Sequence, residues 1–582
     1  MAEGIGGPKF CPECGLKLGG PVNFCPECGT SLGSGVSATL TASALQPASP
    51  SQPVSITQTA QSAGDDPVDL YESGQAALNS GDLTDAFKYY KKSAELGYAP
   101  AQSTLGWCYD YSKGTDQDYS KAIEWYSKSA AQGYSIAQFF MGLCYELGKG
   151  VTQNFPVAVE WYTKAAEQGH APAQRNLGVC YEFGNGTAVN PAAAVEWYTK
   201  SAQQGDSDAQ CNLGYCYESG NGTAKNPAAA VEWYTKAAEV NNLRGLCNLG
   251  WCYESGNGTV KNQAKAAELY LKAAEQNYIR AQCNIGWCYE CGIGVERNPV
   301  KAVEWYAKAA EQGDPRGQYN LGFCFLKGNG ITQNTAKAVD WYMKSAGQGY
   351  SYAQNDLGHL FEYGKGVPKD LAKAAECYIK AADQGLAPAQ CNLGLCYEFG
   401  KGVPKDIFKA VELYIKASEQ GNVLAYSNLG YCYEYGNGVT KDYVKAVELY
   451  LKAAQNGHAF SQCRLGICYK NGNGVPKDEV KAFEWYAKAA EQGDVTAQSC
   501  LGWCYDKGEG TAQNYFKAVE WYLKAAENGD VYAQSNLGFC YEMGNGITQD
   551  LAKAVEWYRK AASQGNEFGK ERLDDLKRKG FA

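Results

Sequence analysis

Four cysteines near the amino terminus have the spacing that binding of a metal ion requires. The hexapeptide FCPECG occurs twice, so Cys11, Cys14, Cys25 and Cys28 follow a C-x2-C-x10-C-x2-C pattern. This spacing places two thiolate pairs on two tight turns, which can close a tetrahedron around one Zn²⁺ ion. The sequence therefore predicts one structural zinc ion bound by these four cysteines.

The residues around the cysteines fit such turns. Pro12 and Pro26 pre-set the backbone of each turn, and a glycine follows each second cysteine. Residues 10–32 resemble a zinc ribbon, a small family whose four-cysteine sites are structural and closed to substrate. The resemblance implies a non-catalytic module, and a module this small is expected to fold only with its metal.

Nucleic-acid binding is the alternative function for this ribbon. A nucleic-acid reader needs Lys and Arg interleaved with aromatic residues. The ribbon has only Lys9 and Lys17, and Glu13 and Glu27 offset them. We therefore favour a structural or protein-docking ribbon and keep a nucleic-acid-associated regulator as the alternative.

Residues 33–66 differ in composition from the rest of the chain. They are rich in Ser, Thr, Ala, Pro and Gln, and they show no apolar periodicity. Such a segment cannot bury enough apolar surface to order itself. We expect a disordered linker that tethers the ribbon to the remainder.

The chain as a whole is long and acidic. Its 582 residues exceed what one hydrophobic core supports, which is about 250–300 residues. The 53 basic and 62 acidic residues give a net charge of -9, which disfavours non-specific attraction to nucleic acid or anionic membranes. The first residues lack a basic and apolar leader, and no apolar run is long enough to span a membrane. We expect a cytoplasmic protein without direct membrane insertion.

The remainder of the chain is an internal repeat with a constant period of 36 residues. One glycine marks the register: Gly106, Gly142, Gly178, Gly214, Gly250, Gly286, Gly322, Gly358, Gly394, Gly430, Gly466, Gly502 and Gly538. A fixed period of this length predicts a stacked array rather than a globular domain.

Each unit is expected to form two helices. In the first helix, apolar residues recur at three- and four-residue spacing, as in Leu177, Cys180 and Tyr181. In the second helix, one tyrosine recurs in all fourteen copies, from Tyr90 to Tyr558. The marker glycine lies in mid-helix, where it costs about 1 kcal/mol relative to alanine. Its recurrence predicts a neighbour that approaches too closely for any Cβ atom.

Twelve cysteines occupy the position two residues after the marker glycine, for example Cys180 and Cys396. Equivalent helices of adjacent units are about 8 to 10 Å apart, which exceeds the Cα separation of about 7 Å that a disulfide tolerates. We expect these cysteines to be small, buried, unpaired residues in a reducing compartment.

The repeats match a known family. The patterns A-Q-x-N-L-G-x-x-Y-x-x-G-x-G-V and K-A-x-x-W-Y-x-K-A-A-x-Q-G resemble the Sel-1-like repeat, a relative of the tetratricopeptide repeat. The resemblance implies an all-α, right-handed superhelical solenoid of helix-turn-helix repeats that serves as an adaptor or scaffold and performs no catalysis. We expect a capping helix pair at residues 67–101, thirteen repeats at 102–565 and a carboxy-terminal capping helix at 566–582.

No residue constellation suggests an enzyme. The only histidines are His170, His359 and His458, and two of them hold the same position between repeats, which indicates packing. The G-x-G segment between the helices lacks the G-K-[ST] of a phosphate loop and is expected to end the first helix in left-handed geometry.

Positions that vary between repeats are where a solenoid recognises partners. The residue after the marker glycine lies opposite the core side of its helix, and eight of these thirteen residues are aromatic. We take as candidate partner-binding residues Trp107, Tyr215, Trp251, Trp287, Phe323, Tyr431 and Trp503, together with the recurring Asn212, Asn248 and Asn284 and the recurring Glu254 and Glu290.

These residues would form a groove that binds an extended peptide. Asparagine amides pair with its backbone, aromatic rings provide anchor pockets, and carboxylates favour a partner with Lys or Arg side chains. The alternative interpretation is that the aromatic rings pack between adjacent first helices and that the acids are ordinary solvated residues.

Overall fold

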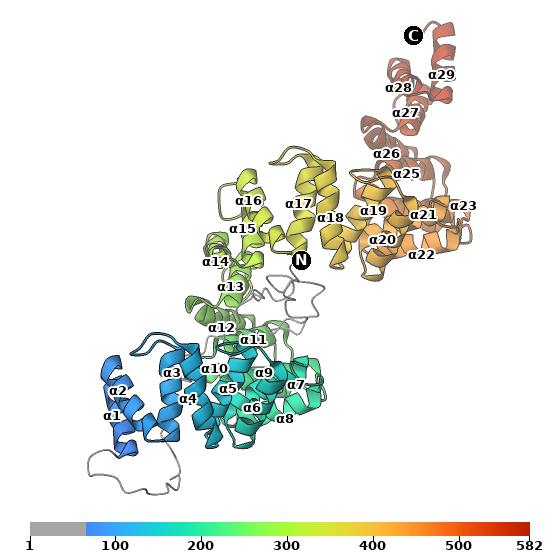
Figure 1. The fold of residues 1–582 in the computed structure, drawn as a ribbon. Helices are drawn as coiled ribbons and strands as arrows, with labels where there is room; N and C mark the ends of the chain where they lie inside the picture. Colours follow the sequence, from blue (N-terminus) through green and yellow to red (C-terminus); the bar gives the residue numbers. More distant parts are fainter. Residues whose placement is uncertain (1–65, 582) are drawn as a thin grey trace. The chain divides into compact units, whose positions relative to one another are not determined.

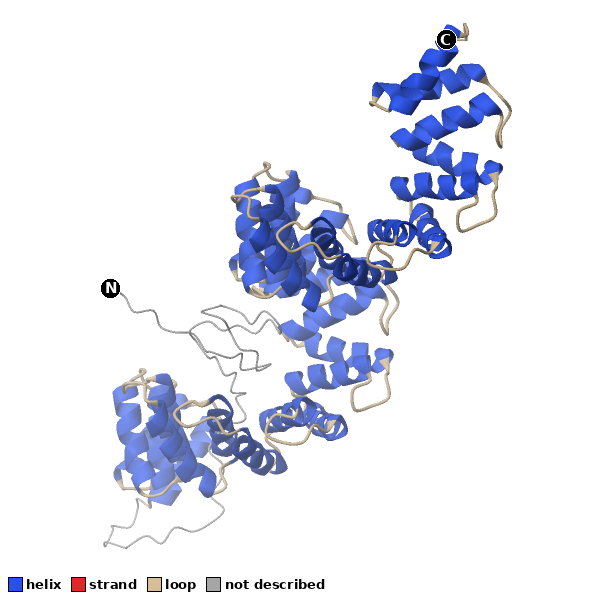
Figure 2. Ribbon diagram, turned by 90° about the vertical axis from the view of Figure 1, so that its right-hand side faces the viewer, coloured by secondary structure: helices blue, strands red, loops and turns tan. Residues whose placement is uncertain are grey.

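The computed structural model describes residues 66–581, and every regular element in that range is an α-helix (Figures 1 and 2). Each full repeat forms two helices of 12 or 13 residues, such as α7 (Ala171–Phe183) and α8 (Pro191–Gln203). Odd-numbered helices are the first helices of their repeats and even-numbered helices are the second. The predicted all-helical repeat architecture is confirmed for this part of the chain.

The chain divides into two compact units, and the boundary between Ala338 and Val339 lies within α16 (Thr335–Gly347). The first unit contains fifteen complete helices: α1 (Pro67–Asn79), α2 (Leu83–Glu95), α3 (Ala99–Asp110), α4 (Tyr119–Ala131), α5 (Ser135–Leu147), α6 (Phe155–Glu167), α7, α8, α9 (Ser207–Ser219), α10 (Pro227–Glu239), α11 (Leu243–Ser255), α12 (Gln263–Glu275), α13 (Ile279–Cys291), α14 (Pro299–Glu311) and α15 (Pro315–Lys327).

The second unit contains thirteen complete helices: α17 (Ser351–Tyr363), α18 (Leu371–Asp383), α19 (Ala387–Phe399), α20 (Ile407–Glu419), α21 (Val423–Tyr435), α22 (Tyr443–Gln455), α23 (Ala459–Asn471), α24 (Glu479–Glu491), α25 (Val495–Lys507), α26 (Tyr515–Glu527), α27 (Val531–Met543), α28 (Leu551–Ser563) and α29 (Glu567–Arg578).

Within each unit, each helix packs against the next helix along the chain. First helices of adjacent repeats also contact one another directly, as α9 does with α11, α25 with α27, and α27 with α29. Among the described helices, no two second helices of adjacent repeats pack against each other as closely as these first helices do. The first helices therefore line the inner side of the local curvature.

The marker glycine allows close contact with the recurring tyrosine. A Cβ atom on Gly394 would lie 2.5 Å from Cε1 of Tyr414, and one on Gly142 would lie 2.5 Å from the ring of Tyr162. All fourteen tyrosines of this position are buried. The predicted close neighbour of the glycine is therefore the tyrosine ring of the second helix.

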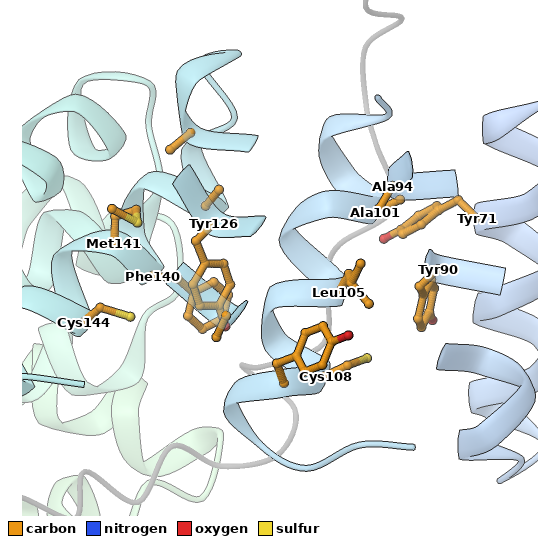
Figure 3. Packing of buried hydrophobic residues seen from close by; sticks show 14 of the residues in the cluster. Tyr71, Tyr90, Ala94, Ala101, Leu105, Cys108, Tyr126, Phe140, Met141 and Cys144 are labelled. Atoms are coloured by element: carbon orange, nitrogen blue, oxygen red, sulfur yellow. The ribbon is translucent and has the colours of Figure 1, made fainter. Parts of the chain in front are cut away.

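Figure 3 shows the core of the first repeats, where Leu105 and Cys108 lie on the same side of α3. Tyr126 stacks on Phe140 with ring centroids 4.9 Å apart. All twelve cysteines two residues after the marker glycine, Cys108 among them, are buried and unpaired, as the sequence predicts.

The G-x-G segment ends twelve of the first helices, from α5 to α27. Gly220 caps α9 in left-handed geometry, with φ at 81°, which confirms the sequence interpretation. The second glycine has a different role, because a Cβ atom on Gly222 would lie 2.1 Å from the carbonyl oxygen of Pro191 at the start of the preceding second helix. The turn of one repeat thus packs on the backbone of the previous repeat.

Two glutamines of the repeat tie helices together. Gln174 in α7 donates through Nε2 to the carbonyl oxygen of Ala166 in the preceding helix, at 3.0 Å. Its Oε1 atom accepts from Nε2 of Gln204, which follows α8, at 2.7 Å. The same glutamine pair joins helices in seven other repeats. These bonds explain why glutamine recurs in the A-Q and Q-G segments of the repeat pattern.

Candidate partner-binding surface on the first helices

The seven candidate aromatic residues all lie at least partly at the surface. Trp251 and Trp287 are 37% and 49% exposed, and the other five are half-buried. Trp107 packs on the core of the first repeats, and its ring centroid lies 6.1 Å from that of Tyr111. Each of these side chains is therefore neither fully buried nor fully exposed.

A second position on the same helix face was missed by the sequence analysis. It lies seven residues before the predicted aromatic, which is two helical turns. In the second unit it holds exposed apolar residues: Tyr352, Leu424, Phe460, Tyr532 and, in the equivalent place of α29, Phe568. The other two repeats of the second unit hold Pro388 and Thr496 there, and the first unit holds Pro100, Ile136, Pro172, Asp208, Arg244, Arg280 and Arg316. This change of residue type from repeat to repeat was the available signal, because a position needed only for packing would keep one type.

A groove of about 820 Å³ lies along three consecutive first helices of the second unit, α25, α27 and α29. Four aromatic residues line it, namely Trp503, Tyr532, Phe539 and Phe568. Phe539 and Phe568 lie 6.2 Å apart between ring centroids. The groove therefore brings one predicted residue, Trp503, together with three that the candidate set did not include.

Polar groups complete the lining of this groove. Asn536 occupies the recurrent asparagine position, and Asp506 occupies the recurrent acid position. Asp506 is nearly buried and pairs with Lys507, whose Nζ atom lies 2.8 Å away. The ammonium group of Lys507 also lies 5.0 Å from the ring centroid of Trp503.

The recurrent acids have partners inside the protein. Tyr270 donates its hydroxyl proton to Oε2 of Glu254 at 2.7 Å, and Tyr306 donates to Oε2 of Glu290 at 2.8 Å. Seven further pairs repeat this bond across 16 residues. Burial raises the pKa of Glu218 above its usual value, although the hydroxyl of Tyr234 acts in the opposite direction. These carboxylates anchor the buried tyrosines, so their geometry does not favour the expected role towards basic partners.

The three candidate asparagines connect neighbouring first helices. Oδ1 of Asn212 accepts from Nη2 of Arg244 at 2.8 Å, and Oδ1 of Asn248 accepts from Arg280 at 3.5 Å. Nδ2 of Asn284 lies 3.5 Å from the sulfur of Cys247. The amide groups of these asparagines therefore contribute to the packing of neighbouring repeats.

Two histidines hold the same place between repeats. His170 accepts the N–H of Ala173 through Nδ1 at 3.3 Å, and its ring packs 4.9 Å from that of Phe139. Burial lowers the pKa of His170 to about 4. The imidazole is therefore neutral at physiological pH and caps α7.

The predicted zinc ligands Cys11, Cys14, Cys25 and Cys28, and the predicted linker up to residue 65, lie outside the described residues. Within residues 66–581, no three His, Cys, Asp or Glu side chains gather as a metal site would require. The helices of that same range are too short and too polar for any of them to cross a membrane.

Comparison with known proteins identifies the repeats. Fourteen consecutive segments match the Sel1 repeat: residues 69–98, 99–134, 135–170, 171–206, 207–242, 243–278, 279–314, 315–350, 351–386, 387–422, 423–458, 459–494, 496–530 and 531–566. The first of these segments covers most of the helix pair that we expected to act as a cap.

Solved structures resemble the chain over a large part of its length. The crystal structure of c5321, a protective antigen of uropathogenic Escherichia coli with an SLR fold, is 33% identical, covers 84% of this chain and 97% of its own, and superposes with a TM-score of 0.53. A Sel1 repeat protein from Oxalobacter formigenes is 36% identical over 42% of this chain and 96% of its own, with a TM-score of 0.39.

Among curated proteins, DAP3-binding cell death enhancer 1 of Rattus norvegicus and of Mus musculus is 42% identical over 48 residues. That segment is 8% of this chain and only 9% of the length of each relative. From the fourteen matched segments, the tyrosine and glycine of each repeat, and the stacked helix pairs, we conclude that this chain belongs to the Sel1 repeat family.

Proposed function

We propose that the protein is a non-catalytic scaffold that binds segments of other proteins along its first helices. Sel1 repeat proteins generally mediate protein–protein interactions, and their solenoids are typically non-catalytic. A scaffold function therefore agrees with the family.

The observation that carries the proposal is the groove between α25, α27 and α29. Tyr532 and Phe568 are 71% and 42% exposed there, and they face a space of about 820 Å³ together with Trp503 and Phe539. Aromatic side chains clustered in a concave site are the usual anchors of a protein interface. An apolar segment of a partner would bury these rings.

The chemistry of the groove favours an extended segment with apolar side chains. Asn536 and Gln564 also line the groove. Because Nε2 of Gln564 already donates to Gln534 at 2.9 Å, Asn536 is the amide that we expect to pair with a peptide backbone. Asp506 pairs with Lys507, and the exposed Glu567 adds a further carboxylate to the lining, so the groove keeps a net negative charge. A partner with Lys or Arg side chains, which the recurrent acids led us to expect, is compatible with this lining.

We also propose that the zinc ribbon acts as a second docking module and that the protein works in the cytoplasm. The spacing of the four cysteines supports a zinc ribbon, and its small number of basic residues favours protein docking over nucleic-acid binding. The buried, unpaired thiols of the repeats support a reducing compartment.

The test is capture of partners from the cell of origin with the full chain as bait, followed by quantitative mass spectrometry. The double variant Tyr532→Ala/Phe568→Ala should lose the partners that the wild type captures. Tyr89→Ala, which removes an exposed ring from the second helix α2, is the matched control and should retain them. Equal capture by all three proteins would reject the groove as the binding site.

A further inference from the structure

Asparagine is followed directly by glycine at ten places in the chain, and the structure divides these Asn-Gly pairs into two sets. Seven of the asparagines lie two residues after the end of a first helix: Asn185, Asn221, Asn257, Asn329, Asn437, Asn473 and Asn545. The other three are the last residue of a helix or follow it directly: Asn456, Asn471 and Asn528.

The Asn-Gly pair matters because it can react with itself. The backbone nitrogen of the glycine attacks Cγ of the asparagine, and the new C–N bond closes a succinimide ring. The bond from Cγ to Nδ2 breaks, and Nδ2 leaves as ammonia with the proton of the glycine nitrogen. Water then opens the ring to aspartate or to isoaspartate, in which the backbone runs through the former side chain. Glycine favours the attack because no Cβ atom hinders the approach of its nitrogen.

The glycine nitrogen is unbonded in the seven turns after first helices. In the described structure, none of the seven glycines donates its backbone N–H in a hydrogen bond. The N–H of Gly457 donates to the carbonyl oxygen of Ala454 at 3.0 Å, and that of Gly529 donates to Ala526 at 3.0 Å. The N–H of Gly472 likewise donates to a carbonyl oxygen within α23. Because the attacking nitrogen must release its proton, these last three glycines have a bond to break first.

The side-chain amides divide the seven turns further. Nδ2 of Asn221 donates to Oε1 of Glu182 at 3.3 Å, and Nδ2 of Asn329 donates to Oε1 of Glu290 at 3.0 Å. An amide held in this way cannot rotate towards the following nitrogen without losing its bond. In the described structure, five asparagines of these turns make no side-chain hydrogen bond: Asn185, Asn257, Asn437, Asn473 and Asn545.

Solvent exposure alone would give a different order of reactivity. Asn456 and Asn528 are exposed, whereas the five asparagines without side-chain bonds are half-buried. Nδ2 of Asn456 and of Asn528 donates to the carbonyl oxygen of Lys452 and of Lys524, each at 2.8 Å. Hydrogen bonding and exposure therefore make opposite predictions for the same pair of residue types.

We propose that these five asparagines, which we call the open Asn-Gly turns, are sites of spontaneous deamidation that loosens the stacking of repeats. Isoaspartate would lengthen the backbone beside a glycine that has no space around it. A Cβ atom on Gly258 would lie 2.1 Å from the carbonyl oxygen of Pro227, and one on Gly546 would lie 2.2 Å from that of Tyr515. The lengthened turn cannot keep this contact with the preceding repeat.

The new carboxylate is unfavourable as well. In three repeats the side chain at this position reaches the recurrent acid of the preceding repeat, for example Lys401, whose Nζ atom lies 2.9 Å from Oε1 of Glu362. Asn437 has the same spacing of 39 residues from Glu398. A carboxylate at position 437 would place two like charges where other repeats place an attractive pair.

Peptide mapping by mass spectrometry tests the sites. The full chain is incubated at mildly alkaline pH, folded or in denaturant, and isoaspartate is detected with a methyltransferase specific for it. In the folded protein the open Asn-Gly turns should convert at least about tenfold faster than Asn456 and Asn528, with Asn221 and Asn329 slower than the open turns. In denaturant all ten pairs should convert at similar rates. The proposal is overturned if Asn456 and Asn528 convert as fast as the open turns in the folded protein.

Thermal unfolding tests the consequence for stacking. The test variant replaces all five open-turn asparagines with lysine, the residue that Lys149, Lys365 and Lys401 supply at this position in other repeats. Circular dichroism would verify that it folds. Asn456→Lys/Asn528→Lys is the matched control. After incubation the thermal midpoint of the wild type and of the control should fall, whereas that of the test variant should stay unchanged. An equal fall in all three proteins would overturn the link between deamidation of these turns and stacking.

Discussion

Gly394 and Tyr414 fit together so closely that a Cβ atom on the glycine would lie 2.5 Å from Cε1 of the tyrosine. The two residues come from the first and second helix of one repeat, α19 and α20. Because the ring of Tyr414 is fully buried, it has no free space to move into. This contact recurs through the array and holds each helix pair together.

The variant Gly394→Ala should therefore be less stable than the wild type. The added methyl group must displace a buried ring, and overpacking of this kind costs about 1 to 3 kcal/mol. Gly347→Ala is the control, because Gly347 is also helical and a Cβ atom there would meet nothing within 4 Å. Gly347→Ala should stabilise the protein by up to about 1 kcal/mol and so raise its midpoint of thermal unfolding. Gly394→Ala should lower that midpoint. Shifts in the same direction at both sites would contradict the assigned role of the glycine.

The contribution of the buried glutamates to the free energy of unfolding should fall as pH rises above 4.5, the usual pKa of a glutamate carboxyl group. Burial raises the pKa of Glu146, Glu182 and Glu218 from the usual 4.5. The folded state therefore holds these protons more tightly than the unfolded chain, and the stability that they contribute below pH 4.5 is lost as pH rises through their folded pKa values.

The triple variant Glu146→Gln/Glu182→Gln/Glu218→Gln should flatten this dependence, since an amide oxygen still accepts the tyrosine hydroxyl and cannot ionise. The measurement is the thermal midpoint between about pH 4 and about pH 7. Glu376→Gln is the control, because the pKa of the exposed Glu376 is lowered by Lys380 and its contribution has the opposite sign. A triple variant with the pH profile of the wild type would show that the carboxyls are not buried in solution.

Metal analysis of the purified full chain should return about one zinc per molecule, the content of a single four-cysteine site. Cys11→Ser/Cys25→Ser removes one thiolate from each pair and should abolish the metal. Cys291→Ser, which removes an exposed cysteine of α13, should leave the zinc content unchanged. Zinc that survives the double substitution would refute the assignment of these ligands.

Trp251 and Trp287 should contribute to partner binding more than to stability. Both rings are partly exposed, so Trp251→Ala/Trp287→Ala should reduce partner capture and shift the thermal midpoint only slightly. Tyr270→Ala removes a fully buried ring from the same part of the chain and should cost about 3 to 5 kcal/mol. If the tryptophan variant loses as much stability as Tyr270→Ala, these rings are packing residues.

The periodic residues of the chain predicted the fold well. The 36-residue spacing, the mid-helix glycine and the recurring tyrosine each impose one local requirement, and those requirements add up to stacked helix pairs. The role of Gly394 was predictable because a glycine inside a helix is costly, so its repeated presence needs a structural reason.

The candidate site was harder to predict, because a sequence pattern places a residue on a helix face without showing its hydrogen bonds. Glu254 looked available to a partner until Tyr270, 16 residues away, was found to donate to it. Asn212 likewise accepts from Arg244 of the next first helix. The position of Tyr532 was missed because its residue type changes from repeat to repeat, although its spacing of seven residues already places it on the same helix face as Phe539.

The central claim is that partners are held in the groove between α25, α27 and α29, and cross-linking tests it most directly. Tyr532 would be replaced by a photo-reactive aromatic amino acid in the full chain, and Tyr89 in a parallel sample. After illumination in the cell of origin, the account predicts a cross-linked partner from position 532 and none from position 89. Cross-links from position 89 alone, or none from position 532 while the partner still co-purifies, would contradict it.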